Sequence, residues 1–303
     1  MDYPAIIKEI GRGAKGARSM TPEQAQELFG LILDGKVPDM ELGAILIALR
    51  IKGESHAELS GFMAALKART RQVAVPEGPR CVILPTYNGA RKQPNLMPLV
   101  ALLLAREGIP VLIQGRHDFE TRVSPFDLLA ALGIQPERSL PDAAATLATR
   151  RVACLRLDML ARGLDWLLGL RLALGVRNCG HTLAKLLDPC CGHSVRVVTV
   201  THPPYLESMQ ALLESEHATA LLMRGTEGES YAAPRRRPRL LGFTNGESQE
   251  LFPQLEMESE GVEELPCTIA DNALLIRQML AGKAAVPQSI LDQVAALRQL
   301  ALR

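Results

Sequence analysis

The chain has 303 residues, of which 47% are hydrophobic and 22% charged, and its formal net charge is +1. This composition is typical of a globular protein with a large core, and six cysteines in such a length exclude a disulfide-stapled scaffold. Charge is unevenly distributed, because residues 73–200 contain 15 cationic and 10 acidic side chains, whereas residues 201–303 contain 9 and 14. A basic middle segment is compatible with a local surface for anionic ligands.

Three features predict a cytoplasmic protein without a membrane partner. The amino-terminal sequence lacks the basic start and apolar run of a signal peptide. The longest apolar stretch, from Leu96 to Ala105, is too short to cross a bilayer, and cysteines are sparse. The sequence Cys190-Cys191-Gly192-His193 has no companion motif with metal-ligand spacing, so we expect no metal site there.

The first 72 residues have the start and stop signals of short helices. Thr21-Pro22-Glu23-Gln24 combines an N-cap, a proline at the first helical position and a capping-box glutamine, and it predicts a helix that ends at Asp34-Gly35. A second helix is expected over 39–50, and Ser55 with Glu58 starts a third. We expect residues 1–72 and a helical stretch at 160–187 to form a small helical domain.

After Arg80, short runs rich in valine and isoleucine alternate with amphipathic segments. The runs predict strands at 82–84, 111–113, 195–200, 221–223 and 240–243, and the segments predict helices at 95–107 and 125–132. This order predicts an α/β fold, in which a small helical bundle domain accompanies a large α/β domain, residues 73–159 with 188–303. Its central sheet is expected to be mostly parallel and covered by helices. Ligands of such sheets bind at the carboxyl ends of strands, where the sequence YNGARKQPN of residues 87–95 lies.

These features resemble anthranilate phosphoribosyltransferase over nearly the whole chain. The most specific match is Gly175-Val176-Arg177-Asn178, followed by Thr182-Leu183 and Leu187-Asp188-Pro189. The resemblance implies the nucleoside phosphorylase/phosphoribosyltransferase fold and a homodimer formed through the helical domain. It also implies a cleft between the domains that binds phosphoribosyl pyrophosphate with Mg²⁺.

The phosphate-binding residues of that family are only partly present. Its GTGGD loop aligns with Pro85–Gly89, where only Thr86 keeps its type, and its KHGNR element aligns with residues 113–117, where the lysine is missing. Its acidic magnesium-binding pair would follow Gly228, where Glu227 and Glu229 are offset. We therefore predict no catalytic residue, no metal and no cofactor. The residues interpreted as a vestigial phosphate and sugar cleft are Thr86, Asn88, Gly89, Asn95 and Gly115.

The chain is similar throughout to the YbiB-type paralogues of that enzyme. The matching segments are YNGARKQPNL at 87–96, GVRNCGHTLAKL at 175–186 and GTEGESYAAP at 225–234. This resemblance implies a homodimer that lacks demonstrated phosphoribosyl transfer and binds DNA and RNA with little sequence preference.

Groups of cations support this hypothesis, because non-specific affinity for nucleic acid comes mainly from Lys and Arg that displace counterions. Each group has a structural alternative, as a set of solvated surface cations or, for Arg177, as the partner of a helix end or carboxylate. Tyr87, and less directly Tyr231, are the aromatic candidates for base stacking. The candidate nucleic-acid-binding residues are Lys8, Arg12, Lys15 and Arg18, on one helical face if the helix continues through Gly11 and Gly13; Arg91, Lys92 and Arg116, in turns after two strands; Arg177 and Lys185, on one face of a hinge helix; and Arg235, Arg236 and Arg237, in a loop.

Three functions fit the sequence. The first is non-catalytic, largely sequence-independent binding of DNA or RNA by a dimer with basic grooves. The alternative is a phosphoribosyl or glycosyl transferase that uses Mg²⁺ and phosphoribosyl pyrophosphate. The third is docking to a cytoplasmic protein through the acidic residues 247–264, which are equally typical of an exposed strand and loop.

Overall fold

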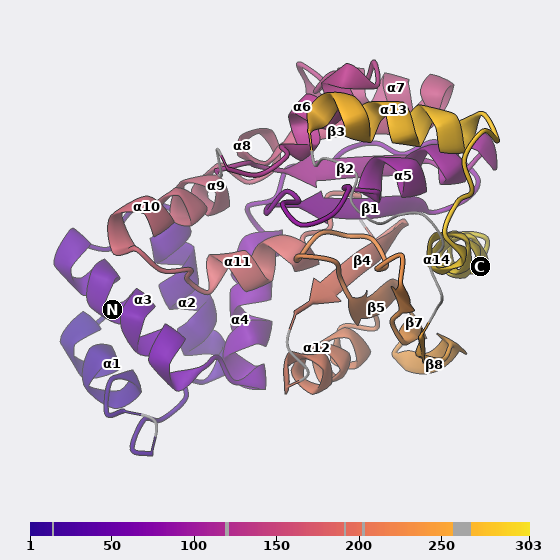
Figure 1. Cartoon of the computed structure of the whole chain (residues 1–303). Helices are drawn as coiled ribbons and strands as arrows, with labels where there is room; N and C mark the ends of the chain where they lie inside the picture. Colours follow the sequence, from indigo (N-terminus) through magenta and orange to yellow (C-terminus); the bar gives the residue numbers. More distant parts are fainter. Residues whose placement is uncertain (14, 119–120, 191, 202–203, 257–267) are drawn as a thin grey trace. The chain divides into compact units, whose positions relative to one another are not determined.

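The computed structural model describes residues 1–13, 15–118, 121–190, 192–201, 204–256 and 268–303 (Figure 1). The chain divides into two compact units. The helical unit contains residues 1–71 and 157–187, and the sheet unit contains residues 72–156 and 188–303. The chain therefore passes between the units after Arg71, after Arg156 and after Leu187. The sequence placed the first two of these crossings after residues 72 and 159.

The helical unit begins with the helices that the capping signals predicted. Thr21 Oγ1 accepts a hydrogen bond from the Gln24 N–H, and the Gln24 side chain accepts one from the Thr21 N–H, so both halves of the capping box form. Ser55 and Glu58 repeat this arrangement. The elements of this unit are α1 (Tyr3–Ile10), α2 (Pro22–Leu33), α3 (Asp39–Lys52), α4 (His56–Lys67), α8 (Leu157–Leu160), α9 (Arg162–Gly169), α10 (Arg171–Leu174), α11 (Gly180–Leu183) and the 3₁₀ turn η1 (Ala184–Leu186).

Two expectations about helix length are wrong. The first helix ends at Ile10 and is capped by Gly11, and Gly13 has a left-handed φ of +79°, so Lys8, Arg12 and Lys15 do not share a helical face. The stretch 160–187 is a series of short helical pieces. Arg177 lies in the non-helical link that Gly175 opens with a φ of +70°, and Lys185 lies in η1, so these two cations do not share a helical face either.

The sheet unit is built on one seven-stranded sheet in the order β3-β2-β1-β4-β5-β7-β8. The first five of these strands are parallel, while β7 pairs antiparallel with β5 and β8 antiparallel with β7. The predicted α/β class with a mostly parallel sheet is therefore confirmed. The strands are β1 (Cys81–Thr86), β2 (Val111–Gly115), β3 (Val152–Arg156), β4 (Ser194–Val200), β5 (Ala220–Arg224), β7 (Leu240–Thr244) and β8 (Glu247–Phe252), and a separate ribbon pairs β6 (Arg236–Arg237) with β9 (Leu255–Glu256).

Helices cover the sheet because alternate strand residues are apolar on both faces. On one face, Val82, Val111 and Val195 share a buried cluster with α5, α13 and α14. Helix α12 contacts β5 and β8, and its buried Leu212 and Leu213 lie outside that cluster. The helices of this unit are α5 (Met97–Arg106), α6 (Pro125–Ala131), α7 (Leu140–Arg150), α12 (Pro204–Ser215), α13 (Ile269–Leu280) and α14 (Gln288–Ala301) (Figure 1).

The parallel strands β1 to β5 all end at the same edge of the sheet, which we call the carboxyl edge. Thr86, the last residue of β1, is paired with Gly115 of β2, which in turn is paired with Arg156 of β3. Val200 and Arg224, the last residues of β4 and β5, are likewise paired. The loops that follow these strands therefore meet at one side of the sheet unit. None of the helices in the described part of the chain has the length and apolar character needed to span a membrane.

A close contact between α2 and α4 yields a stability prediction. A Cβ atom at Gly61 of α4 would lie 2.3 Å from the Pro22 carbonyl oxygen and 2.8 Å from the Ala25 Cβ. We expect Gly61→Ala to lower the free energy of unfolding by about 1–3 kcal/mol, since both helices must shift. Gln26→Ala, at an exposed residue of α2, is the control and should stay within about 0.5 kcal/mol. Chemical unfolding at fixed protein concentration measures both, and equal effects would contradict the packing argument.

Candidate functional site

The loops after β1 and β2 lie against each other at the carboxyl edge. Ala90 and Val123 form an antiparallel bridge, and the Arg122 guanidinium donates to the Gly89 carbonyl oxygen at 3.3 Å. Gly89 has a φ of +67°, and a Cβ there would lie 2.5 Å from the Val123 carbonyl oxygen. Glycine is therefore required at residue 89 by backbone conformation and by close packing. The prediction that both turns share one edge of the sheet is confirmed.

A buried carboxylate accepts hydrogen bonds from the backbone N–H groups of the loop after β1. Glu229 Oε1 accepts hydrogen bonds from the N–H groups of Tyr87, Asn88 and Gly89 at 3.2, 2.8 and 3.0 Å. Glu229 Oε2 accepts one from Thr86 Oγ1 at 2.5 Å, and the Glu229 side chain is 0% exposed. Four converging donors thus stabilise the carboxylate, which is the arrangement in which a buried carboxylate is tolerated.

The second carboxylate of the same turn holds the next part of the loop. Glu227 accepts hydrogen bonds from the Arg91 and Lys92 N–H groups at 3.2 and 2.9 Å. It does so from a left-handed conformation with a φ of +52°, which is uncommon for a residue with a side chain. A Cβ at Gly228, between the two glutamates, would lie 2.2 Å from the Asn88 side-chain nitrogen. The 225–231 turn and the 86–92 loop are therefore packed in direct contact.

This arrangement does not fit Mg²⁺ with phosphoribosyl pyrophosphate. A pyrophosphate cradle needs free backbone N–H groups that converge on the ligand, and it needs carboxylates that are free to hold the metal. Here the carboxylates of Glu227 and Glu229 accept hydrogen bonds from the loop N–H groups. Neither these N–H groups nor these carboxylates are therefore available to a ligand or a metal ion. Pro85 has no N–H to contribute, and Ile113 stands where the family has its lysine. Among the described residues, no three His, Cys, Asp or Glu side chains are grouped to hold a metal ion.

The residues interpreted as a vestigial cleft have structural partners. Asn95 is fully buried, and its Oδ1 accepts from the Met97 N–H at the start of α5, while its Nδ2 has no partner among the described residues. A Cβ at Gly115 would lie 1.7 Å from the Thr86 carbonyl oxygen, so Gly115 allows β1 and β2 to approach. Tyr87 is 8% exposed with its hydroxyl bonded to Gln114, and Tyr231 is 0% exposed with its hydroxyl bonded to the Pro94 oxygen. The prediction that these tyrosines stack on bases is wrong.

The candidate cations differ in whether a carboxylate already pairs with them. Lys8, Lys15, Arg91 and Lys92 are exposed, and no ion pair joins their side chains to a carboxylate in the described ranges. Arg235 is exposed, while Arg177 and Lys185 are half-buried and have interactions of their own. The paired cations are Arg12 and Arg18, with Glu9 at 2.7 and 3.7 Å; Arg116, with Asp118 at 2.7 Å; Arg236, with Glu256 at 2.9 Å; and Arg237, with Asp292 at 2.5 Å.

Arg237 is a structural residue, contrary to its interpretation as part of a binding loop. Its Nε donates to the Pro253 carbonyl oxygen at 2.9 Å, its guanidinium lies 5.4 Å from the Phe252 ring centroid, and its side chain is 11% exposed. The cation therefore ties the β6–β9 ribbon to Asp292 of α14.

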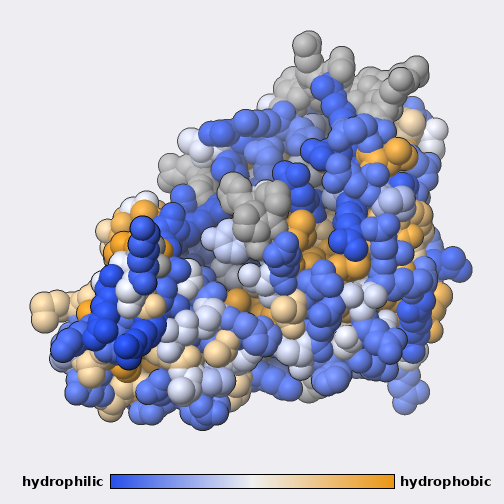
Figure 2. Space-filling view, turned by 90° about the horizontal axis from the view of Figure 1, so that it is seen from below, coloured by the Kyte–Doolittle hydropathy of each residue, from blue (hydrophilic) through white to orange (hydrophobic). Residues whose placement is uncertain are grey.

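Figure 2 shows a face of the molecule on which hydrophilic residues predominate and hydrophobic residues form smaller patches.

The Gly175–Asn178 motif is held within the helical unit. Arg50 donates to the Arg177 carbonyl oxygen at 2.8 Å, and the Asn178 side chain donates to the Leu167 oxygen while it accepts from the Gly180 N–H. Burial, and then the Glu54 carboxylate, raise the pKa of the neighbouring Cys179 thiol, so that this thiol is not a nucleophilic thiolate. The motif thus shapes the link between α10 and α11.

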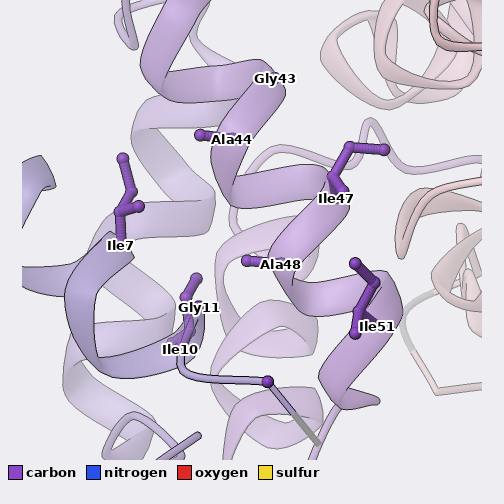
Figure 3. A pocket seen from close by; sticks show the side chains of 9 residues that line it. Ile7, Ile10, Gly11, Gly43, Ala44, Ile47, Ala48 and Ile51 are labelled. Carbon is purple, nitrogen blue, oxygen red and sulfur yellow. The ribbon is translucent and has the colours of Figure 1, made fainter.

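An apolar groove lies between α1 and α3 in the helical unit, with a volume of about 500 Å³. Figure 3 shows Ile47 and Ile51 on one side of the groove and Ile7 and Ile10 on the other, with small residues between them. Ile51 is 64% exposed, and Met40 near the start of α3 is 80% exposed. Exposed apolar side chains on a helix that lines an apolar groove are typical of a protein interface.

The comparisons with known proteins agree with this architecture. The helical bundle domain of a glycosyl transferase family matches residues 4–70. YbiB of Escherichia coli (strain K12), an uncharacterized protein, is 39% identical over 299 residues, which are 97% of this chain and 93% of YbiB. An anthranilate phosphoribosyltransferase of Methylocella silvestris is 27% identical over 238 residues, 78% of this chain and 67% of that enzyme. The crystal structure of anthranilate phosphoribosyltransferase (TrpD) from Thermus thermophilus superposes with a TM-score of 0.75 and 25% identity, over 99% of this chain and 88% of that chain.

A helical bundle domain joined to a mostly parallel α/β domain defines a protein of the anthranilate phosphoribosyltransferase fold. Within that class the chain belongs to the YbiB family, which is related to anthranilate phosphoribosyltransferase.

The sequence did not reveal the role of Glu227 and Glu229. Their offset from the expected acidic pair was visible, but their contacts with residues 87–92 join segments about 140 residues apart. Alternation of glutamate and glycine in Thr226-Glu227-Gly228-Glu229 was the available signal, since glycine permits a close backbone approach.

The buried carboxylate gives a direct test. We expect Glu229→Gln to lower the free energy of unfolding by about 2–4 kcal/mol, because the amide cannot satisfy four donors and places its own N–H₂ among them. Glu207→Gln, at an exposed residue of α12, is the control and should stay within about 0.5 kcal/mol. Urea unfolding followed by circular dichroism measures both. If the two variants unfold at the same urea concentration, Glu229 does not hold the loop.

Proposed function

We propose that this protein is a non-catalytic, largely sequence-independent nucleic-acid-binding protein that acts as a homodimer. The observation that carries the proposal is the 86–92 loop, which presents the exposed Arg91 and Lys92 at the carboxyl edge while its N–H groups are filled by Glu227 and Glu229. A small phosphate ligand would need those N–H groups. A polyanion needs only the cationic side chains, since its affinity comes from counterion release.

The transferase reading is the second candidate, and the comparisons favour it over nucleic-acid binding, since the enzymes named among the relatives above are anthranilate phosphoribosyltransferases. Thr86, Asn95 and Gly115 also keep residue types of that family. Against it stands the occupied loop, in which the carboxylates that would hold Mg²⁺ accept backbone hydrogen bonds instead. The geometry of the site therefore favours the non-catalytic reading.

Dimer formation is proposed through the groove of α1 and α3. The groove is lined by apolar and small residues without a charged side chain, which suits a self-complementary contact with a second copy. A dimer would double the number of Arg91–Lys92 loops available to one polymer. A protein partner for the acidic stretch 247–264 is the weakest reading, because residues 247–256 form β8 and β9 and the remainder lies outside the described residues.

Nucleic-acid binding predicts a dependence on salt and on the loop cations. We expect the affinity for mixed-sequence oligonucleotides to fall steeply between low and physiological salt, and Arg91→Ala/Lys92→Ala to weaken all sequences alike by about tenfold. The double variant Arg150→Ala/Lys283→Ala removes the same charge from exposed residues elsewhere and should change affinity less than twofold. Fluorescence anisotropy with single-stranded DNA, duplex DNA and RNA measures these effects. Absence of binding at low salt would refute the proposal.

Binding of phosphoribosyl pyrophosphate tests the competing transferase function. Titration calorimetry with phosphoribosyl pyrophosphate and Mg²⁺ should give no binding heat at millimolar ligand, since Glu229 fills the cradle. An anthranilate phosphoribosyltransferase under the same conditions serves as the positive control. Saturable heat from this protein would favour the transferase function.

A further inference from the structure

We propose that Arg224, together with Arg239, extends the Arg91–Lys92 loop into a continuous cationic row across the carboxyl edge, and that this row is the track for the polyanion. This inference rests on the proposed function and names residues of its binding surface. The row consists of Arg116, Arg91, Lys92, Arg224 and Arg239, and we call it the sheet-edge row.

The sheet topology brings the segments that carry these cations to the carboxyl edge. Arg116 follows β2, the loop with Arg91 and Lys92 follows β1, and Arg224 ends β5. Arg239 directly precedes β7, which runs antiparallel to β5 and therefore begins at the edge where β5 ends. The strand order β2-β1-β4-β5-β7 contains four inter-strand steps, so the row spans about 19 Å at the usual spacing of about 4.8 Å.

Arg224 has no structural role that explains its charge. It is exposed, while the other four residues of β5 are buried. No hydrogen bond or ion pair connects its side chain to another residue in the ranges that the structure describes.

The turn of residues 225–231, which contains Glu227 and Glu229, also fixes the spacing of the sheet-edge row. Arg224 precedes Glu227 by three residues, and the Glu227 carboxylate accepts from the Arg91 and Lys92 N–H groups. The backbone that carries Arg224 is therefore anchored to the backbone that carries Arg91 and Lys92, which fixes their spacing before a ligand arrives.

The acidic groups along this edge leave a net cationic surface. Asp118 pairs with Arg116 at 2.7 Å, and Glu250 pairs with Arg239 at 2.6 Å. The side chains of Arg239 and Glu250 are 55% and 44% exposed, so this pair is solvated and open to exchange for a phosphate. Glu227 faces backbone N–H groups, and Arg91, Lys92 and Arg224 remain without a described carboxylate partner.

The polymer that suits such a row is a nucleic-acid strand, whose backbone carries a charge about every 3.4 Å and so offers several phosphates within about 19 Å. Base readout is not expected, because the two tyrosines of the neighbouring loops are buried. Each cation of the row should contribute one phosphate contact and about 0.7–0.9 of a released counterion.

The experiment compares Arg224→Ala with Arg150→Ala, an exposed arginine at the end of α7 just before β3, at the opposite edge of the sheet. Both variants lose one positive charge. Affinity for a mixed-sequence 20-nucleotide DNA strand is measured by anisotropy at several salt concentrations, and thermal melting confirms that each variant is folded. We expect Arg224→Ala to bind about three- to tenfold more weakly with a shallower salt slope, Arg224→Lys to restore binding, and Arg150→Ala to bind within twofold of the parent chain.

The outcomes separate the row from the proposed function. If the parent chain binds but Arg224→Ala binds equally well, the row is wrong while nucleic-acid binding stands. Equal weakening by Arg224→Ala and Arg150→Ala would show an effect of net charge alone and would also overturn the row. Failure of the parent chain to bind at low salt would remove the proposed function and the row together.

Discussion

The hydrogen bonds of the Glu229 carboxylate hold the loop after β1 against the turn after β5 at the carboxyl edge of the sheet. Three backbone N–H groups and one hydroxyl converge on this carboxylate in the interior, in the geometry that the loop would offer to a phosphate. Because the carboxylate belongs to the same chain, it competes without the loss of translational freedom that a free ligand must overcome. An external phosphate would have to displace a buried anion and leave it unpaired, which is strongly unfavourable.

The fold of this protein is that of its relatives, whereas the hydrogen bonds of the loop after β1 are a property of its own side chains. A close relationship to YbiB and a full-length superposition on anthranilate phosphoribosyltransferase establish the architecture. The same fold can lose one activity and serve another, because function resides in the particular side chains at a site. Here the N–H groups of the loop after β1 donate to internal carboxylates, and the side chains of Arg91 and Lys92 are exposed.

Local signals in the sequence predicted the helical unit well, and they failed where the backbone turns. The capping boxes at Thr21 and Ser55 involve residues three apart, so the sequence alone identifies both partners. Extending the first helix through Gly11 and Gly13 gave a false cationic face, since those glycines end it. The arginine run at 235–237 was visible as charge, but its partners Asp292 and Glu256 are distant in sequence, and the sequence could not show that Arg237 is structural.

The amino-acid sequence by itself determined the α/β class, the helix starts and the strands β1, β2, β4, β5 and β7. Hydrophobic periodicity and capping are short-range properties, and these features depend on little else. Only the tertiary structure decided that Glu229 fills the loop, that Tyr87 and Tyr231 are buried, and that Arg224 stands at the same edge as Arg91. The physical reason is that each of these facts depends on contacts between segments far apart in the chain, such as the 140 residues that separate Gly89 from Glu229, and only the packed sheet brings them together.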